Sequence, residues 1–276
     1  MLLDRDELQA YDRDGVTHLK NVIPFGWIEH LRNATEDAIT DHSPGWHSVL
    51  KNNTVDMAEF SPAGASPGPY FVTLNCWREH EAFMAFASDS PAPAIAGDLM
   101  MSNRVYLYED ALHIKEPGTQ AEVYWHNDRG YHHVEGPSCV LWIPLDPITE
   151  ENGGLVFMRG THKDPIKYRP NLLVDPTLLP GTEGEPIPVM DDNSSKAITF
   201  DMVPGDALAF SMKTFHMSGG NQSLTTRRRA LAIKYLGKGA RWQIRPGVPL
   251  RDLPEWIQSG MKVKSDDHSP LVWWGA

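Results

Sequence analysis

From Asn103 to Leu236 the chain is a series of short runs of β-branched and aromatic residues, separated by clusters of Gly, Pro or Asn. Many short strands with turn residues between them are typical of antiparallel sandwiches and barrels. Helical spacing of apolar residues occurs before this region, and predicts helices at 4–13, 24–40 and 78–97, with a strand at 16–20. We expect Pro91 and Pro93 to break the third helix. The predicted strands cover residues 105–108, 112–115, 122–126, 139–145, 155–159, 197–202, 207–211 and 228–236.

Two segments rich in proline and glycine interrupt this pattern, at 41–70 and 163–196. Loops this long inside a compact domain are usually lids or binding loops. We therefore expect them to form the walls and lid of a binding site. Their candidate contact residues, apolar and charged, are Trp46, His47, Lys51, Phe60, Tyr70, Tyr168 and Arg169.

Composition narrows the function classes. The 276 residues suit one domain, 1–276, and the net charge of −11 disfavours nucleic acid and anionic membranes as partners. The two cysteines, Cys76 and Cys139, exclude a disulfide scaffold and read as buried small hydrophobes. The first residues lack the pattern of a signal peptide, and no apolar run is long enough to span a bilayer. We expect a cytoplasmic protein. Nothing in the sequence specifies an oligomeric state.

The stretch Tyr124-Trp125-His126-Asn127-Asp128 contains the strongest candidate metal ligands. On a strand, His126 and Asp128 would point to the same side. His216, which follows an apolar run at 207–211, is the best candidate for a third ligand. Two His and one carboxylate leave open positions that suit non-haem Fe(II). Taken alone, an H-x-D pattern is more often a surface strand with two polar residues.

Eight motifs in a fixed order add weight to the metal interpretation. They are Asp14-Gly15-Val16, Lys115-Glu116-Pro117-Gly118, His126-Asn127-Asp128, Trp142-Ile143-Pro144-Leu145-Asp146, Glu151-Asn152-Gly153-Gly154, Gly160-Thr161-His162-Lys163, Gly205-Asp206 and His216-x-Ser218-Gly219-x-Asn221-x-Ser223.

Over residues 4–237 this pattern resembles the phytanoyl-CoA dioxygenase (PhyH) family of Fe(II)/2-oxoglutarate oxygenases. The resemblance implies a mainly β fold with flanking helices, a double-stranded β-helix of the jelly-roll or cupin-like kind. It also implies Fe(II) as cofactor, 2-oxoglutarate as co-substrate, and iron ligands at His126, Asp128 and His216.

In this family, an arginine on the last barrel strand holds the far carboxylate of 2-oxoglutarate, and three consecutive arginines are available here. The family's spacing from the second histidine points to Arg227, whereas alignment of the strand sequence Arg-Arg-Ala-Leu points to Arg228. We favour Arg228, because strand alternation groups it with two small alanines that leave room for a ligand. The other residues with family counterparts are Ser218, which helps to hold the same carboxylate, and Trp142, which is equally well read as a core tryptophan.

The implied reaction consumes O2 and releases succinate and CO2 while a small-molecule substrate is hydroxylated, desaturated or cyclised at an unactivated carbon. Chlorinating relatives lack the carboxylate ligand, so Asp128 argues against halogenation. Candidate substrates are a carboxylate, a phosphonate or a natural-product intermediate, whereas an acyl-CoA has little support because basic residues do not cluster elsewhere. Two other classes stay open: a cupin-like zinc or manganese enzyme, and a non-catalytic barrel that binds a metabolite.

Several nearby residues are weaker candidates. Tyr131 and Arg129 lie close to the H-x-D motif and would bind substrate or pack at the barrel mouth. His132 and His133 are candidates for the substrate side, and a position at the surface or behind the ligands is favoured over iron binding. The remaining two are His162, expected in a turn, and Lys115, which would hold an anionic group or serve the structure alone.

Overall fold

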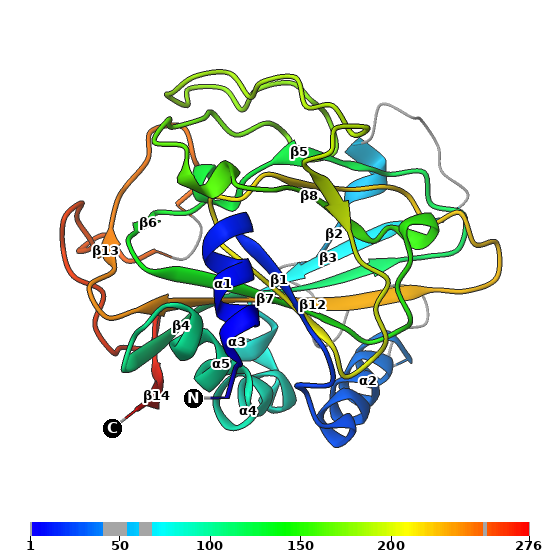
Figure 1. The fold of residues 1–276 in the computed structure, drawn as a ribbon, viewed down its shortest axis with the longest axis horizontal. Coiled ribbons are helices and arrows are strands. Elements are labelled where there is room, and N and C mark those ends of the chain that lie inside the picture. Colours follow the sequence, from blue (N-terminus) through cyan, green and yellow to red (C-terminus); the bar gives the residue numbers. More distant parts are fainter. Residues whose placement is uncertain (1, 41–53, 61–67, 251–252, 276) are drawn as a thin grey trace.

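The computed structural model describes residues 2–40, 54–60, 68–250 and 253–275. A large antiparallel sheet faces a smaller one, and helices cover the other side of the large sheet (Figure 1). The α-helices are α1 Arg5–Asp14, α2 Phe25–Thr40, α3 Cys76–Glu79, α4 Glu81–Asp89 and α5 Ala92–Leu99. Short 3-10 turns are η1 Met57–Phe60, η2 Asp128–Tyr131, η3 Glu150–Asn152 and η4 Thr161–Lys163.

The large sheet has the strand order β1-β10-β7-β12-β4-β3-β2, with β14 also paired to β4, and the smaller sheet has the order β5-β11-β8-β9. A third pair, β6 and β13, lies at one end. The strands are β1 Val16–Leu19, β2 Thr54–Asp56, β3 Tyr70–Leu74, β4 Arg104–Lys115, β5 Val123–His126, β6 Val134–Glu135, β7 Ser138–Pro144, β8 Leu155–Met158, β9 Ala197–Thr199, β10 Ala207–Phe210, β11 His216–Ser218, β12 Arg228–Gly237, β13 Arg241–Trp242 and β14 Leu271–Trp274.

The large sheet is buried on both faces, because alternate residues of each strand serve two different cores. On β12, Leu231 and Ile233 pack in the core beneath the helices, whereas Ala230 and Ala232 belong to the core between the two sheets. Because side chains alternate along a strand, the small residues of β12 point toward the barrel interior and the large ones point toward the helices. The interior face keeps space for a cavity.

The predicted helices are confirmed in two of three cases. Asp4 caps α1 through a reciprocal capping box with Glu7, and Gly15 ends this helix in the left-handed region at φ 78°. The segment predicted at 78–97 is helical but divides into α3, α4 and α5, and the expected break at Pro91 is confirmed between α4 and α5. Pro93 does not break it, because this proline lies in the first turn of α5, where the missing N–H has no partner to lose.

The strand predictions are confirmed in type and corrected in extent. The runs 105–108 and 112–115 form one continuous strand, β4. Of the predicted loop 41–70, residues 41–53 and 61–67 lie outside the described residues, and 54–60 form β2 and η1 rather than a loop. The loop at 163–196 is confirmed, because residues 164–196 contain neither helix nor named strand. None of the helices described in the structure is long and apolar enough to cross a membrane.

Candidate active site

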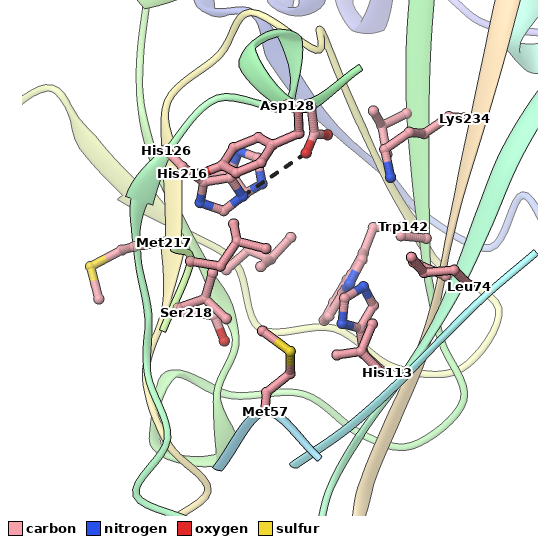
Figure 2. A pocket seen from close by; sticks show the side chains of 18 of the residues that line it. Met57, Leu74, His113, His126, Asp128, Trp142, His216, Met217, Ser218 and Lys234 are labelled. Carbon is pink, nitrogen blue, oxygen red and sulfur yellow. Dashed lines mark ion pairs between the residues drawn. The ribbon is translucent and has the colours of Figure 1, made fainter. Parts of the chain in front are cut away.

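Two side chains of the smaller sheet and one from the turn η2 converge on one point inside the barrel. Each of His126, Asp128 and His216 offers one ligand atom, and these atoms lie within 4.8 Å of one another. His126 Nε2 and Asp128 Oδ1 are 3.9 Å apart, the contact dashed in Figure 2. Two imidazoles and one carboxylate at this spacing fit a divalent transition metal.

Strand pairing explains why these residues meet. His126 ends β5 and is the register partner of His216 on β11, so the two imidazoles start from opposite positions on adjacent strands. The sequence argument placed Asp128 on the same strand as His126. In the structure, β5 ends at His126 and Asp128 begins the turn η2. Because Asn127 stays extended at φ −123° and ψ 145°, the alternation continues for one residue and Asp128 still points to the side of His126.

The backbone orients both imidazoles. His126 Nδ1 donates to the carbonyl of Tyr124 at 2.8 Å, and His216 Nδ1 donates to the carbonyl of Thr214 at 3.0 Å. A carbonyl can only accept, so the proton of each neutral ring is on Nδ1 and Nε2 keeps its lone pair. Metal-binding histidines are commonly held this way.

The protonation states also fit a metal. Burial lowers the pKa of His126 to about 3 and lowers the pKa of His216 in the same direction. Burial would raise the pKa of Asp128, but the positive charge of Lys234 and the nearby imidazoles outweigh it, so this pKa lies below its usual range. At neutral pH the cluster therefore has two neutral imidazoles and a carboxylate, the forms that coordinate metals.

A second polar group lies on the large sheet, where Tyr70, Lys115 and Arg228 form one row across β3, β4 and β12. We call it the cation row. Lys115 is fully buried and Arg228 is 2% exposed. Lys115 Nζ lies 4.7 Å from the centroid of the Tyr70 ring and donates to Ser218 Oγ at 2.8 Å.

The two cations of this row have only neutral partners. Arg228 donates to the carbonyls of Asn152 and Gly153 at 3.3 and 3.1 Å, and Lys115 also donates to the carbonyl of Gly219. Among the residues that the structure describes, no carboxylate forms an ion pair with either cation. Burial and the nearby guanidinium lower the pKa of Lys115 well below its ordinary value, and burial lowers that of Arg228 to about 10. This end of the barrel is therefore suited to an anion.

The other two arginines face away from the interior. Arg229 pairs with Asp146 at 2.7 Å on the helix side of β12, and Arg227 pairs with Glu116 at 2.8 Å. The predicted preference for Arg228 over Arg227 is therefore supported by the direction of the side chain, since Arg228 alone of the three lines the central cavity. Its carboxylate-binding role remains a prediction.

One cavity of about 330 Å³ is lined by the metal cluster and by Tyr70 and Arg228 of the cation row, whereas Lys115 lies behind Ser218, to which it donates. Figure 2 shows His126, His216 and Ser218 on one side of it, with Trp142, His113 and Lys234 opposite. Trp142 is not only a core residue, because it lines the cavity and the guanidinium carbon of Arg228 lies 5.7 Å from its ring centroid. All six predicted site residues therefore border the same space: His126, Asp128, His216, Ser218, Trp142 and Arg228.

The weaker candidates divide into two groups. Tyr131 and His132 line the cavity, as does Tyr70 from the first predicted loop. His132 and His133 are both buried, so of their predicted positions the surface is excluded and a place on the substrate side or behind the ligands is left. Cys76 and Cys139 are free thiols and buried, as predicted.

Other predicted contact residues lie elsewhere. Arg129 pairs with Glu135 at 2.9 Å and, with Tyr168, lines a separate cavity of about 240 Å³. Arg169 binds Thr182 within the loop, and His162 binds the carbonyl of Asp12 in a turn. Trp46, His47 and Lys51 lie outside the described residues, as does the side chain of Phe60.

Among the cavity residues not identified from the sequence are Met57, Glu109, His113 and Lys234. The sequence does contain an indication for Lys234. It lies inside the apolar run Ala-Leu-Ala-Ile-Lys-Tyr-Leu of a central strand, where a buried lysine needs a polar partner. His113 lies 2.9 Å from the Tyr70 hydroxyl, and burial together with the nearby cations lowers its pKa to about 3.

Two neutral imidazoles and a carboxylate inside a barrel of two facing sheets characterise non-haem iron oxygenases, and with an anion site beside them they define the 2-oxoglutarate-dependent class. A family model described as "Phytanoyl-CoA dioxygenase (PhyH)" matches residues 11–230. The chain therefore belongs to the phytanoyl-CoA dioxygenase family, as its motifs predicted.

Curated relatives agree with this family. Phytanoyl-CoA dioxygenase 1 of Oryza sativa subsp. japonica is 28% identical over 130 residues, 46% of this chain and 44% of its own length. The multifunctional dioxygenase prhA of Penicillium brasilianum is 31% identical over 194 residues, 62% of this chain and 58% of its own. The chain thus spans about half the length of these relatives.

Solved structures confirm the predicted double-stranded β-helix. The epimerase SnoN from nogalamycin biosynthesis, in complex with Fe3+, alpha ketoglutarate and nogalamycin RO, superposes with a TM-score of 0.72 at 19% identity, covering 97% of each chain. EctD from S. alaskensis, with 2-oxoglutarate and 5-hydroxyectoine, gives 0.69 at 19% identity, covering 95% of this chain and 86% of its own.

Proposed function

We propose that the protein is an Fe(II)/2-oxoglutarate-dependent dioxygenase that hydroxylates, desaturates or cyclises an unactivated carbon of a small-molecule metabolite, with release of succinate and CO2. The observation that carries the proposal is that one cavity is lined both by the His126–Asp128–His216 cluster and by Arg228 of the cation row. A keto-diacid needs a metal at one end and a fixed cation at the other, and this cavity offers both.

Each residue has a definite part in this proposal. His126, Asp128 and His216 would hold iron, which supplies the oxygen chemistry when bound. Arg228 and Lys115 would bind the far carboxylate of 2-oxoglutarate, and Ser218, which already accepts from Lys115, would donate to it. Trp142 would pack beside the co-substrate and keep water from the guanidinium of Arg228. Because the carboxylate of Asp128 would occupy the third ligand position, no coordination position is left there for a halide, and the proposed reaction is not a halogenation.

The ligand assignment is tested without turnover. Under anaerobic conditions, Fe(II) plus 2-oxoglutarate should give a weak visible charge-transfer band, and His126→Ala or Asp128→Ala should abolish it. His162→Ala is a matched control, because this histidine lies in a turn away from the cavity and its loss should leave the band in place. A band that persists in both ligand variants would refute the assignment.

The activity is tested by screening a metabolite library for succinate release. A hit must raise succinate formation above the uncoupled background and yield an oxidised product of the same compound. A cupin-like zinc or manganese enzyme, or a non-catalytic barrel, would bind metal or metabolite without consuming 2-oxoglutarate. A cytoplasmic location belongs to the same proposal, supported by the two free thiols.

A further inference from the structure

The cavity has a second charged row on the large sheet. Lys234 on β12 is the register partner of Glu109 on β4 and of Val140 on β7, and Lys234 Nζ lies 3.1 Å from Glu109 Oε1. His132 Nε2 lies 3.8 Å from the same carboxylate oxygen. The side chains of Lys234, Glu109 and His132 are 5–8% exposed, and all three line the cavity. We call Lys234 and Glu109 the Lys–Glu row.

The Lys–Glu row is far from the cation row. Six residues separate Lys234 from Arg228 along β12, which at the rise of a strand is about 20 Å. Figure 2 shows Lys234 at the end of the pocket where Asp128 lies, whereas Ser218 lies toward the other end. The Lys–Glu row therefore lies at the end of the cavity where the metal ligand Asp128 is, away from the cation row, and it borders the space left for the substrate when 2-oxoglutarate is held at the cation row.

A β-bulge fixes this row in place. Lys234 pairs with Glu109 but the next residue, Tyr235, pairs with Leu107, so Tyr108 is an extra residue on β4. The Tyr108 ring meets His132 edge-on, with centroids 5.5 Å apart. Bulges interrupt the ladder and redirect side chains, and they recur beside active sites. Here the bulge places an aromatic ring behind the histidine that approaches Glu109.

Charge balance determines which ligand this row can accept. Lys234 faces two carboxylates, Glu109 and Asp128, and a metal ion at the cluster would compensate the charge of Asp128. The ammonium of Lys234 and the carboxylate of Glu109 then neutralise one another, so a charged substrate group would bring an uncompensated charge into a buried wall. A neutral hydroxyl adds no charge. It can accept a hydrogen bond from an ammonium and donate one to a carboxylate, which are the two groups that the row presents.

The other residues that line the cavity indicate how apolar the bound molecule is. Besides the polar residues already named, the cavity has an apolar lining on several strands and on the loop at 164–196. Its apolar residues include Val72, Leu74, Ala111, Val140 and Leu173. Apolar walls with a few placed polar groups are typical of sites for small organic molecules, whose orientation is set by the polar groups.

We propose that Lys234 and Glu109 form a substrate-recognition site for a mostly apolar small molecule that carries a neutral hydroxyl group. This inference rests on the proposed function and names the substrate class for the same cavity. The hydroxyl sets the orientation, so the carbon presented to the metal is determined by its distance from that group.

The test uses three probes with the same ring and different polar groups: cyclohexylmethanol, cyclohexanecarboxylate and cyclohexylmethylamine. Their binding to the protein loaded with redox-inert Zn(II) and 2-oxoglutarate is measured by ligand-observed NMR. We expect the alcohol to bind at least about tenfold more tightly than either charged probe, the difference expected when hydrogen bonds to charged groups decide binding.

The informative variant is the double substitution Lys234→Met with Glu109→Gln. It keeps the side-chain volumes and removes both charges together, because removing only one would leave an unpaired buried charge and threaten folding. The preference for the alcohol should disappear in this variant. Val140→Ala is the matched control on the same row, and it should weaken all three probes alike.

Three results would overturn the inference: equal or tighter binding of a charged probe, an alcohol preference that survives in the double variant, or no alcohol binding at millimolar concentration. Failure of the proposed function would look different. In that case the unsubstituted protein would show no charge-transfer band with Fe(II) and 2-oxoglutarate, whereas failure of this inference alone leaves that band intact in both proteins.

Discussion

Lys115 and Arg228 are register partners on neighbouring strands, and both are buried in the barrel interior. Two like charges placed side by side away from water repel one another and lose solvation, which is why burial and the guanidinium lower the pKa of Lys115. A bound dicarboxylate would remove both penalties. Relief of the repulsion between Lys115 and Arg228 should therefore contribute to the free energy of 2-oxoglutarate binding.

Arg228→Ala should weaken 2-oxoglutarate binding by at least about tenfold, because it removes a charge-assisted hydrogen bond in a buried site. Arg229→Ala should leave co-substrate affinity nearly unchanged and lower the free energy of unfolding by about 1–2 kcal/mol, because it breaks the pair with Asp146. Anaerobic titration of the charge-transfer band and urea unfolding measure the two effects. A large loss of affinity in Arg227→Ala alone would show that the register preference is wrong.

Affinity for 2-oxoglutarate should fall as the pH rises toward the alkaline range. Lys115 attracts the carboxylate only while protonated, and its pKa in the free protein is below the ordinary lysine value, so the loss should begin at a lower pH than for a surface lysine. In Lys115→Met this alkaline decrease should vanish while the affinity is low throughout. Isothermal titration of the metal-loaded protein across pH 7 to about 10 measures it, and an identical pH profile in the variant would argue against a role for Lys115.

Gly153→Ala should disturb the cation row from outside the cavity. A methyl group there would lie 2.8 Å from the carbonyl oxygen of Gly219, 3.0 Å from an Arg228 nitrogen and 3.1 Å from a Lys115 carbon. Gly160→Ala is the matched control, since its φ of +80° is close to the +86° of Gly153 but nothing lies within 4 Å. Both variants should lose stability through backbone strain, and only Gly153→Ala should also lose 2-oxoglutarate affinity. Equal affinities in the two variants would contradict this.

The free energy of unfolding should fall as the pH drops below about 6.5, the ordinary pKa of histidine. The folded-state pKa values of His113 and His126 are lowered to about 3, so across this interval the unfolded chain binds protons that the folded chain does not. The stabilisation that each neutral histidine gives the folded chain is fully present above the histidine pKa of the unfolded chain. It is lost on acidification at ~1.4 kcal/mol per pH unit for each histidine. His113→Gln should reduce that slope by one histidine's share in urea unfolding between pH 4 and about 6. An unchanged slope would show that His113 is not a buried neutral group.

The strand alternation that identified Arg228 was reliable because β12 is regular from Arg228 to Lys234. The H-x-D pattern succeeded for a similar local reason, since Asn127 keeps the extended backbone for one residue past the end of β5. Both inferences needed only the two-residue period of a strand, which is encoded in neighbouring residues.

Features that depend on distant partners were not predicted. β4 was read as two strands because Glu109 and Asp110 interrupt its apolar pattern. In the fold both charges are buried: Glu109 meets Lys234, and Asp110 accepts from the backbone N–H of Trp77 at 3.1 Å. β11 has three residues and no pattern of its own, so its pairing with β5 and β8 arises only in the assembled sheet.

The bulge at Tyr108 has a consequence for divergence within the family. It lies just beyond Lys234, so from Arg228 to Lys234 the register of β12 against β4 is unbroken and one ladder carries both the Lys–Glu row and the cation row. A change of register at Lys234 and Glu109 would therefore also move Lys115 against Arg228, and we expect descendants of this chain to change the molecule that they oxidise by replacing side chains on this ladder rather than by shifting its strands.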